Sequence, residues 1–184
     1  VRSYQIGGRS LIWGKQSYCG NKKGFTANLE DGNGVDWPIR YDDLVPWYDH
    51  VECFAGISGS KEGLDILPDG IFQTPMELNY VEQEVMKGIE SNFKNRHLII
   101  GRSAHLTDPT QEQTALERST CQHRNHCKRG CPFGAYFSTQ AAILPAARQT
   151  ENVILVKNKI LYQVIFDKET DKAIGVKAID EKTR

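Results

Sequence analysis

Three of the five cysteines lie close together in the second half of the chain, where they could bind a metal centre. They fall within eleven residues, with five and then three residues between them: Cys121, Cys127 and Cys131. Structural zinc sites usually contain a CxxC pair, which is missing here, whereas three thiolates on an irregular loop followed by Pro132 suit a three-iron four-sulfur cluster. A zinc site completed by His123 or His126 is a second interpretation, and a disulfide that leaves one thiol free is a third. The spacing alone leaves all three open.

The residues around these cysteines carry basic but no acidic side chains. Positions 118 to 131 contain no Asp or Glu and four cations: Arg118, Arg124, Lys128 and Arg129. Nearby cations lower the pKa of thiols and offset the negative charge of a cluster bound by thiolates. The composition of this loop therefore favours thiolate chemistry.

A second candidate site lies near the start of the chain, where glycines precede a cation and a hydroxyl. The sequence there runs Ile6-Gly7-Gly8-Arg9-Ser10-Leu11-Ile12-Trp13-Gly14. Glycines permit a tight turn or the close approach of a ligand, and Arg9 and Ser10 can donate hydrogen bonds to an anionic group. The block lacks the complete GxGxxG pattern, so the local sequence by itself favours a tight turn beside a packed tryptophan.

The whole chain has the composition of an ordinary globular protein. Of its 184 residues, 39% are hydrophobic and 25% are charged, and 23 Lys and Arg balance 23 Asp and Glu. This composition excludes the collagen-like, coiled-coil and disordered classes. A net charge of zero provides no general attraction for nucleic acid or an anionic membrane, and no apolar run approaches the roughly 20 residues that span a bilayer.

The apolar periodicity predicts an α+β fold class with several helices. One helix should begin at Asp42 or Asp43 as N-cap, and Ser138 should cap another that runs through Ala147. Between them, residues 74–77 resemble a capping box that opens a helix with a core-facing stripe. The apolar residues of that stripe are Leu78, Val81, Val85, Ile89 and Phe93.

Strands are predicted mainly in the C-terminal part of the chain. Residues 153–156, 160–166 and 173–179 are three β-rich runs, and residues 167–172 form a turn between the last two. These runs predict an antiparallel β-meander, and a further short strand is expected at residues 97–100. The chain starts at Val1 without an initiator Met and stops soon after the last run, so we expect an internal piece of a longer protein.

Four sequence blocks together resemble the glucose-methanol-choline (GMC) oxidoreductases. They occur in the order found in that family: the glycine-rich block 6–14, Asp36-Trp37-Pro38-Ile39-Arg40-Tyr41-Asp42-Asp43-Leu44, Cys131-Pro132-Phe133-Gly134-Ala135, and Ile174-Gly175-Val176. The resemblance extends over essentially the whole chain. It is closest to the branch that contains the FAD-dependent glucose, gluconate, sorbitol and fructose dehydrogenases.

The resemblance implies a flavoprotein that oxidises a sugar or alcohol by hydride transfer to FAD. The positions that match the family's FAD-contacting block are Gly7, Gly8, Arg9, Ser10, Trp13 and Gly14. Trp13 occupies a position where some relatives carry a His that links the flavin covalently, so the resemblance implies noncovalent FAD. Residues 153–179 are similar to the family's FAD-domain meander, with the backbone of Leu161 near the adenine.

The resemblance also assigns the three cysteines to a three-iron four-sulfur cluster that relays electrons to a cytochrome or a small-subunit partner. This implies a dehydrogenase, and it is compatible with a bacterial periplasmic or membrane-associated enzyme. The expected segments are a flavin-contacting part (1–40), a helical and loop region towards the substrate domain (41–120), the Cys cluster with a helix (121–150), and the meander (151–184).

No catalytic residue is assigned in this chain, because the family's dinucleotide fingerprint and catalytic His pair are expected outside it. A noncatalytic Cys/His zinc-binding or interaction module is the alternative function.

Overall fold

The computed structural model describes residues 4–183 and divides into two compact units. The first ends at Gln149 and the second begins at Thr150. The first unit consists of helices joined by long irregular connections, and the second is a β-hairpin. The expected α+β class is therefore confirmed.

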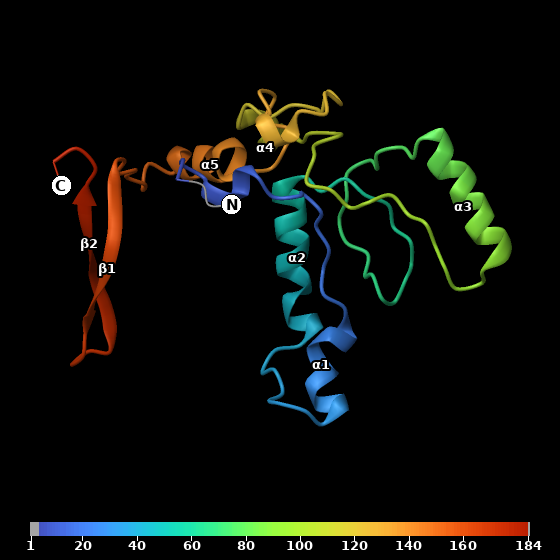
Figure 1. Cartoon of the computed structure of the whole chain (residues 1–184), viewed down its shortest axis with the longest axis horizontal. Helices are drawn as coiled ribbons and strands as arrows, with labels where there is room; N and C mark the ends of the chain where they lie inside the picture. Colours follow the sequence, from blue (N-terminus) through green and yellow to red (C-terminus); the bar gives the residue numbers. More distant parts are fainter. Residues whose placement is uncertain (1–3, 184) are drawn as a thin grey trace. The chain divides into compact units, whose positions relative to one another are not determined.

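The first unit contains several short helices (Figure 1). The α-helices are α1 (Lys22–Asp31), α2 (Tyr41–Ala55), α3 (Tyr80–Asn92), α4 (Gln111–Ala115) and α5 (Leu144–Gln149). Two 3₁₀ turns, η1 (Gly8–Leu11) and η2 (Cys127–Arg129), and one π-helical turn, η3 (Thr139–Ile143), complete the set. Within residues 4–183, no helix has the length and apolar character needed to cross a membrane.

Two of these helices begin at other residues than the sequence predicted. Helix α2 has Arg40 as its N-cap in place of Asp42 or Asp43, and the Asp43 carboxylate accepts a hydrogen bond from the Arg40 N–H at 2.8 Å. Residues 74–77 do not start a helix. The capping box of α3 is formed by Asn79 and Glu82, whose side chains each bond to the other's backbone N–H.

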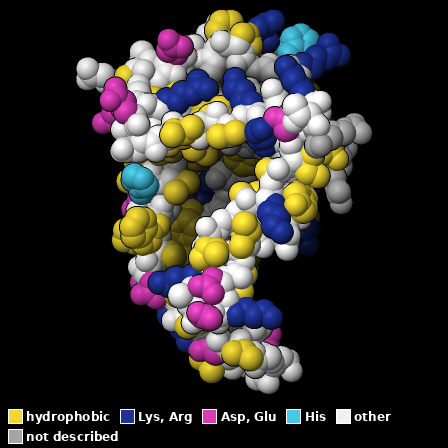
Figure 2. All heavy atoms as spheres, turned by 90° about the vertical axis from the view of Figure 1, so that its left-hand side faces the viewer, with side chains coloured by type: hydrophobic (Ala, Val, Ile, Leu, Met, Phe, Trp, Pro, Cys, Tyr) yellow, Lys and Arg dark blue, Asp and Glu magenta, His cyan; other side chains and the backbone are white. Residues whose placement is uncertain are grey.

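The apolar stripe of α3 does not face a core in this chain. Val81 is 68% exposed and Val85 48% exposed, and the helix has no buried residue. The apolar periodicity therefore predicted the helix correctly, but the prediction that its stripe is buried was wrong. Hydrophobic side chains also reach the surface among charged ones at several places in the space-filling view (Figure 2).

Two further differences concern local structure. Residues 97–100, expected as a strand, form an irregular segment. Helix α1, in a region where mainly turns were expected, is capped by the Asn21 side chain, which accepts from the Gly24 N–H at 2.8 Å. Its buried residue is Phe25, so an apolar stripe could not have revealed it. The Ser138 cap is confirmed, with its hydroxyl accepting from the Ala141 N–H at 3.1 Å.

The first unit is organised around an extended stretch, residues 102–106, which we call the central segment. Its backbone is hydrogen-bonded to residues from segments far apart in the sequence: Lys15, Ser17, Ser58, Cys121, Ala135 and Phe137. Beside it lies a small hydrophobic core in which Trp13, Phe72 and Phe137 pack against the buried Ala55, Ile57 and Ala104. The central segment thus connects the glycine-rich start of the chain to residues 118–137, which carry the three clustered cysteines and are called the cysteine loop.

The second unit is a two-stranded antiparallel sheet of β1 (Lys159–Asp167) and β2 (Lys172–Asp180). The predicted turn between these strands is confirmed. Residues 153–156 form no strand, so the sheet is a hairpin where a three-stranded meander was expected. Most of the apolar side chains of the hairpin are exposed.

Replacing Gly56 by Ala should destabilise the first unit by about 3 kcal/mol. Gly56 has φ +73°, and an added Cβ would lie 2.0 Å from Leu106 Cδ2 and 2.9 Å from Gln113 Nε2. Gly32 is the matched control, because it has φ +66° and no atom within 4 Å of an added Cβ. Gly32→Ala should cost only the backbone strain of about 1 kcal/mol. Urea unfolding of the full-length protein measures the free energy of unfolding of both variants. Equal losses of stability in the two variants would contradict the steric argument.

Candidate functional site

The three clustered cysteines line one small cavity of about 30 Å³. Cys127 lies on η2, while Cys121 and Cys131 lie on the irregular chain before and after it. His105 of the central segment and His126 line the same cavity. All five cysteines of the chain are free thiols, so the structure contains no disulfide between them.

The donor set of this cavity fits a thiolate-bound cluster in its chemistry. Three unpaired thiols share one cavity, and the loop that carries them has basic but no acidic residues. In the described part of the chain, no three His, Cys, Asp or Glu side chains converge on one point as ligands of a single ion would. A cluster in which each thiolate binds a different iron does not require such convergence.

His105 is connected to both the central segment and the cysteines. Its Nδ1 lies 2.6 Å from Ser103 Oγ, and its Nε2 lies 3.4 Å from Cys127 Sγ. Burial lowers the pKa of this imidazole, and the positive charges of Lys15 and His123 lower it further. The ring is therefore held between a serine and a candidate cluster ligand.

Lys15 and Tyr136 form a second contact beside the same loop. The Lys15 Nζ lies 4.0 Å from the centroid of the Tyr136 ring, and Lys15 is buried with φ +66°. Burial lowers the pKa of the lysine and raises the pKa of Tyr136 to about 12. The Tyr136 hydroxyl donates to the Ser10 carbonyl at 2.8 Å. This contact joins the cysteine loop to the glycine-rich start.

Arg118 fixes the cysteine loop to the end of α2. Its guanidinium donates to the carbonyls of Phe54 at 3.2 Å, Ala55 at 2.8 Å and Gly134 at 3.0 Å, and the residue is 1% exposed. A cation at the C-terminal end of a helix is also favoured by the helix dipole. Burial lowers the pKa of Arg118 to about 10, which leaves it charged at neutral pH.

The glycine-rich block forms a tight turn with open space beside it. Gly7 and Gly8 have φ +98° and +50°, and an added Cβ at Gly8 or Gly14 would meet no atom within 4 Å. In residues 4–183, no hydrogen bond or ion pair holds the exposed Arg9 guanidinium, so this cation is accessible to an anion. These features fit the approach of a ligand phosphate.

Ser10 and Trp13 also make structural contacts. The Ser10 hydroxyl lies 2.7 Å from the Gly7 carbonyl and 3.0 Å from Thr139 Oγ1 and accepts from the Thr139 N–H at 3.0 Å. The Trp13 indole donates to the Phe137 carbonyl at 3.0 Å. Both residues therefore hold the start of the chain to the segment after the cysteines.

A larger cavity of about 600 Å³ is lined by residues from both the glycine-rich block and the cysteine loop. Its wall includes Leu11 and Ile12 from the glycine-rich block and Cys131 and Gly134 from the cysteine loop. Leu161 lies on β1 in the second unit, with its side chain exposed. Of the three clustered cysteines only Cys131 lines this cavity, and the residues expected to contact FAD lie beside Leu11 and Ile12 in the sequence without lining it themselves.

The sequence analysis did not identify the contributions of His105, Lys15 and Tyr136. Their partners lie far away in the sequence: Cys127 is 22 positions from His105, and Tyr136 is 126 positions from Ser10. No spacing motif marks such contacts. The left-handed backbone of Lys15 is likewise visible only in the structure.

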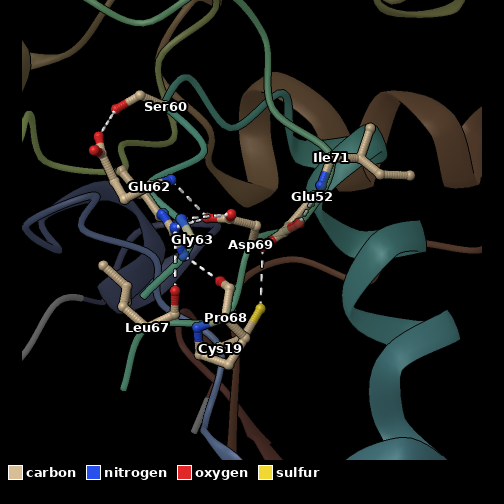
Figure 3. Close-up of polar contacts among 10 residues, drawn as sticks. Cys19, Glu52, Ser60, Glu62, Gly63, Leu67, Pro68, Asp69 and Ile71 are labelled. Carbon is tan, nitrogen blue, oxygen red and sulfur yellow. Dashed lines mark hydrogen bonds and ion pairs between the residues drawn. The ribbon is translucent and has the colours of Figure 1, made fainter. Parts of the chain in front are cut away.

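A separate polar network holds the loop that follows α2 (Figure 3). The buried Glu52 carboxylate accepts from the Ile71 N–H at 2.9 Å and from the Cys19 thiol at 3.1 Å. Burial, together with Glu52, raises the pKa of the Cys19 thiol to about 12. Arg102 binds the Asp69 carboxylate at 2.8 Å and the Pro68 carbonyl. Cys19 is therefore kept as a neutral thiol, and it does not line the cavity of the three clustered cysteines.

Comparison with known proteins places this arrangement in a family. The family model for GMC oxidoreductase matches residues 2–184, and the chain belongs to this family. The chain is also 26% identical over 180 residues to the fructose dehydrogenase large subunit of Gluconobacter japonicus. That alignment covers 95% of this chain and 30% of the relative, so the chain spans less than a third of the relative's length. The resemblance found in the sequence is thus confirmed.

Replacing Arg118 by Met should loosen the cysteine loop. One buried and two partly buried carbonyls would lose the Arg118 donor, which should cost about 3 kcal/mol. Hydrogen-deuterium exchange of residues 131–137 in the full-length protein should become faster. Arg124→Met is the control, because the exposed Arg124 contacts only the Phe133 ring, at 5.7 Å, among the described contacts. Unchanged exchange in the Arg118 variant would show that the loop does not depend on this residue.

Proposed function

We propose that this chain is part of an FAD-dependent dehydrogenase that oxidises a CH–OH group of a sugar or alcohol. In this proposal the three cysteines bind an iron-sulfur cluster that passes electrons to a cytochrome or small-subunit partner. The observation that carries the proposal is the cavity of about 600 Å³, whose wall contains Leu11 and Ile12 of the glycine-rich block together with Cys131. A flavin site and an electron relay must lie close together to exchange electrons, and this cavity supports such proximity.

The glycine-rich block is suited to bind the cofactor. When bound, FAD supplies the hydride acceptor for the oxidation. The bare backbone at Gly8 and Gly14 leaves room for a ligand, and the accessible Arg9 guanidinium can pair with a phosphate. Trp13 and Ser10 hold this turn in place through their contacts with Phe137 and Thr139. Leu161 contributes to the adenine end in our proposal.

The cysteine loop is suited to bind the cluster. When bound, an iron-sulfur cluster supplies a one-electron carrier. Cys121, Cys127 and Cys131 supply thiolates, and the cations of the loop, Lys128 and Arg129 among them, offset their negative charge. Arg118 keeps the loop in position through the Gly134 carbonyl.

The substrate class that we propose for this enzyme is based on the name of its relative from Gluconobacter japonicus. Its name, fructose dehydrogenase large subunit, indicates a sugar substrate and a multisubunit enzyme for that protein. We propose the same classes of substrate and partner here. The general base is assigned to a part of the enzyme outside this chain, because His105 bonds to Ser103 and Cys127 and the other four histidines match no catalytic motif.

The flavin should be bound noncovalently. Trp13 replaces the His that serves as a covalent attachment point in some relatives, and its indole N–H is bonded to the Phe137 carbonyl. Acid precipitation of the purified full-length protein should therefore release the flavin absorbance into the supernatant. Flavin that stays with the precipitate would refute this expectation, and a protein purified without flavin would refute the proposed function.

The full-length protein purified without oxygen should contain about three irons per flavin and show a low-temperature EPR signal when oxidised. Cys127→Ser should abolish this signal and electron transfer to the acceptor while the flavin content is retained. Cys53→Ser is the matched control, because Cys53 is an exposed cysteine of α2 that does not line the cavity. It should keep both iron and signal.

Other metal contents would distinguish the alternatives. Stoichiometric zinc without an EPR signal would favour a zinc site completed by His123 or His126. A preparation with no metal and a cysteine pair that resists alkylation until it is reduced would favour the disulfide. Either result would remove the electron relay from the proposal and leave the flavin assignment standing.

A further inference from the structure

His105 is the histidine whose ring contacts a candidate cluster ligand. The distance from its Nε2 to Cys127 Sγ is 3.4 Å, within the range of a hydrogen bond to sulfur. His126 lines the same cavity, but within residues 4–183 no hydrogen bond joins its ring to a cysteine. The role of His105 depends on whether its Nε2 donates or accepts in the hydrogen bond with the Cys127 sulfur.

The neighbouring groups determine that direction. A thiolate that binds iron has no proton, so Cys127 can only accept and His105 Nε2 must donate. On the other side of the ring, the Ser103 hydroxyl lies 2.6 Å from Nδ1 and can donate to it. A serine that donates to Nδ1 fixes the ring proton on Nε2, facing the sulfur.

The central segment holds this pair rigidly. Ser103 exchanges two backbone hydrogen bonds with Ser58, at 2.8 and 2.9 Å, and both serines are buried. On either side of His105, the Ala104 N–H donates to the Lys15 carbonyl at 2.9 Å and the Leu106 N–H donates to the Ala135 carbonyl at 3.0 Å. Hydrogen bonds of the residues on both sides therefore fix the backbone at His105, and this backbone places the imidazole beside Cys127.

We propose that His105 is a positioning residue that donates a hydrogen bond from Nε2 to the Cys127 sulfur and so raises the reduction potential of the cluster. This inference rests on the proposed function, because it requires a cluster at the cysteines. Reduction adds negative charge to the cluster, and a donor to a ligand sulfur stabilises the reduced state more than the oxidised state. Lys15 and Lys128 act on the same loop through charge alone, without a directed bond to the sulfur among the described contacts.

The test is an EPR-monitored redox titration of the full-length protein. His105→Leu should keep its iron-to-flavin ratio and its EPR signal, because His105 is not a ligand. Its cluster should become about tenfold harder to reduce, which for one electron is a fall of about 59 mV. The wild-type cluster should also show an exchangeable proton near the sulfur by ENDOR, and this coupling should be missing in the variant.

Three further variants separate the hydrogen bond from a general structural effect. His105→Gln keeps an N–H donor and should recover part of the potential. Ser103→Ala removes the group that fixes the ring proton and should lower the potential by a smaller amount. His126→Leu changes the other histidine of the cavity and should leave the potential unchanged.

The outcomes are distinct from those that test the cluster itself. An unchanged potential in His105→Leu with the cluster present would overturn the role of His105 and leave the proposed function intact. Loss of iron from both the Leu and the Gln variants would overturn it too, because His105 would then act as a ligand or a structural residue. A wild-type protein without iron would overturn the proposed relay together with this inference.

Discussion

The pairing of the central segment determines how the first unit is held together. Buried backbone groups must find hydrogen-bond partners, and residues 102–106 find theirs in four other segments of the chain. Few large side chains fill the interior, so this backbone pairing carries much of the specificity of the fold. Two of the clustered cysteines contact it, Cys121 through the Leu106 carbonyl and Cys127 through His105, and Trp13 packs against the core that contains Ala104.

Buried polar side chains extend this arrangement. Arg102 and Arg118 are both 1% exposed, and each binds carbonyl groups of a neighbouring segment. An uncompensated charge in such a place would be costly, so each arginine fixes the position of the groups that surround it. Arg118 thereby aligns the loop after Cys131, and Arg102 aligns the loop before Phe72. The interior is specified by directed bonds more than by apolar volume.

Local signals in the sequence predicted some elements correctly and misplaced the starts of α2 and α3. The Ser138 cap and the hairpin turn depend on neighbouring residues, and both were predicted correctly. The start of α3 was placed several residues too early, because Thr74 and Asn79 both have side chains suited to cap a helix.

Burial and long-range contacts were not predictable in the same way. The stripe of α3 has the period of a buried face, but Val81 and Val85 stay largely exposed to solvent among residues 4–183. The cysteine spacing marked the site, whereas the bond between His105 and Cys127 depends on the path of the central segment. Such contacts arise from tertiary pairing, which a periodicity cannot encode.

The pairing between distant segments also affects the order in which the chain can fold. The contact between Ser10 and Thr139 spans 129 residues, whereas the hairpin closes between neighbouring strands. Hairpins form within about 1–10 μs, but at 5–20 residues per second a ribosome needs on the order of ten seconds to synthesise the residues between Ser10 and Thr139. The glycine-rich turn therefore emerges long before its partners exist. During translation, the hydrogen bonds of Ser10 to Tyr136 and Thr139 can form only after the cysteine loop has left the ribosome.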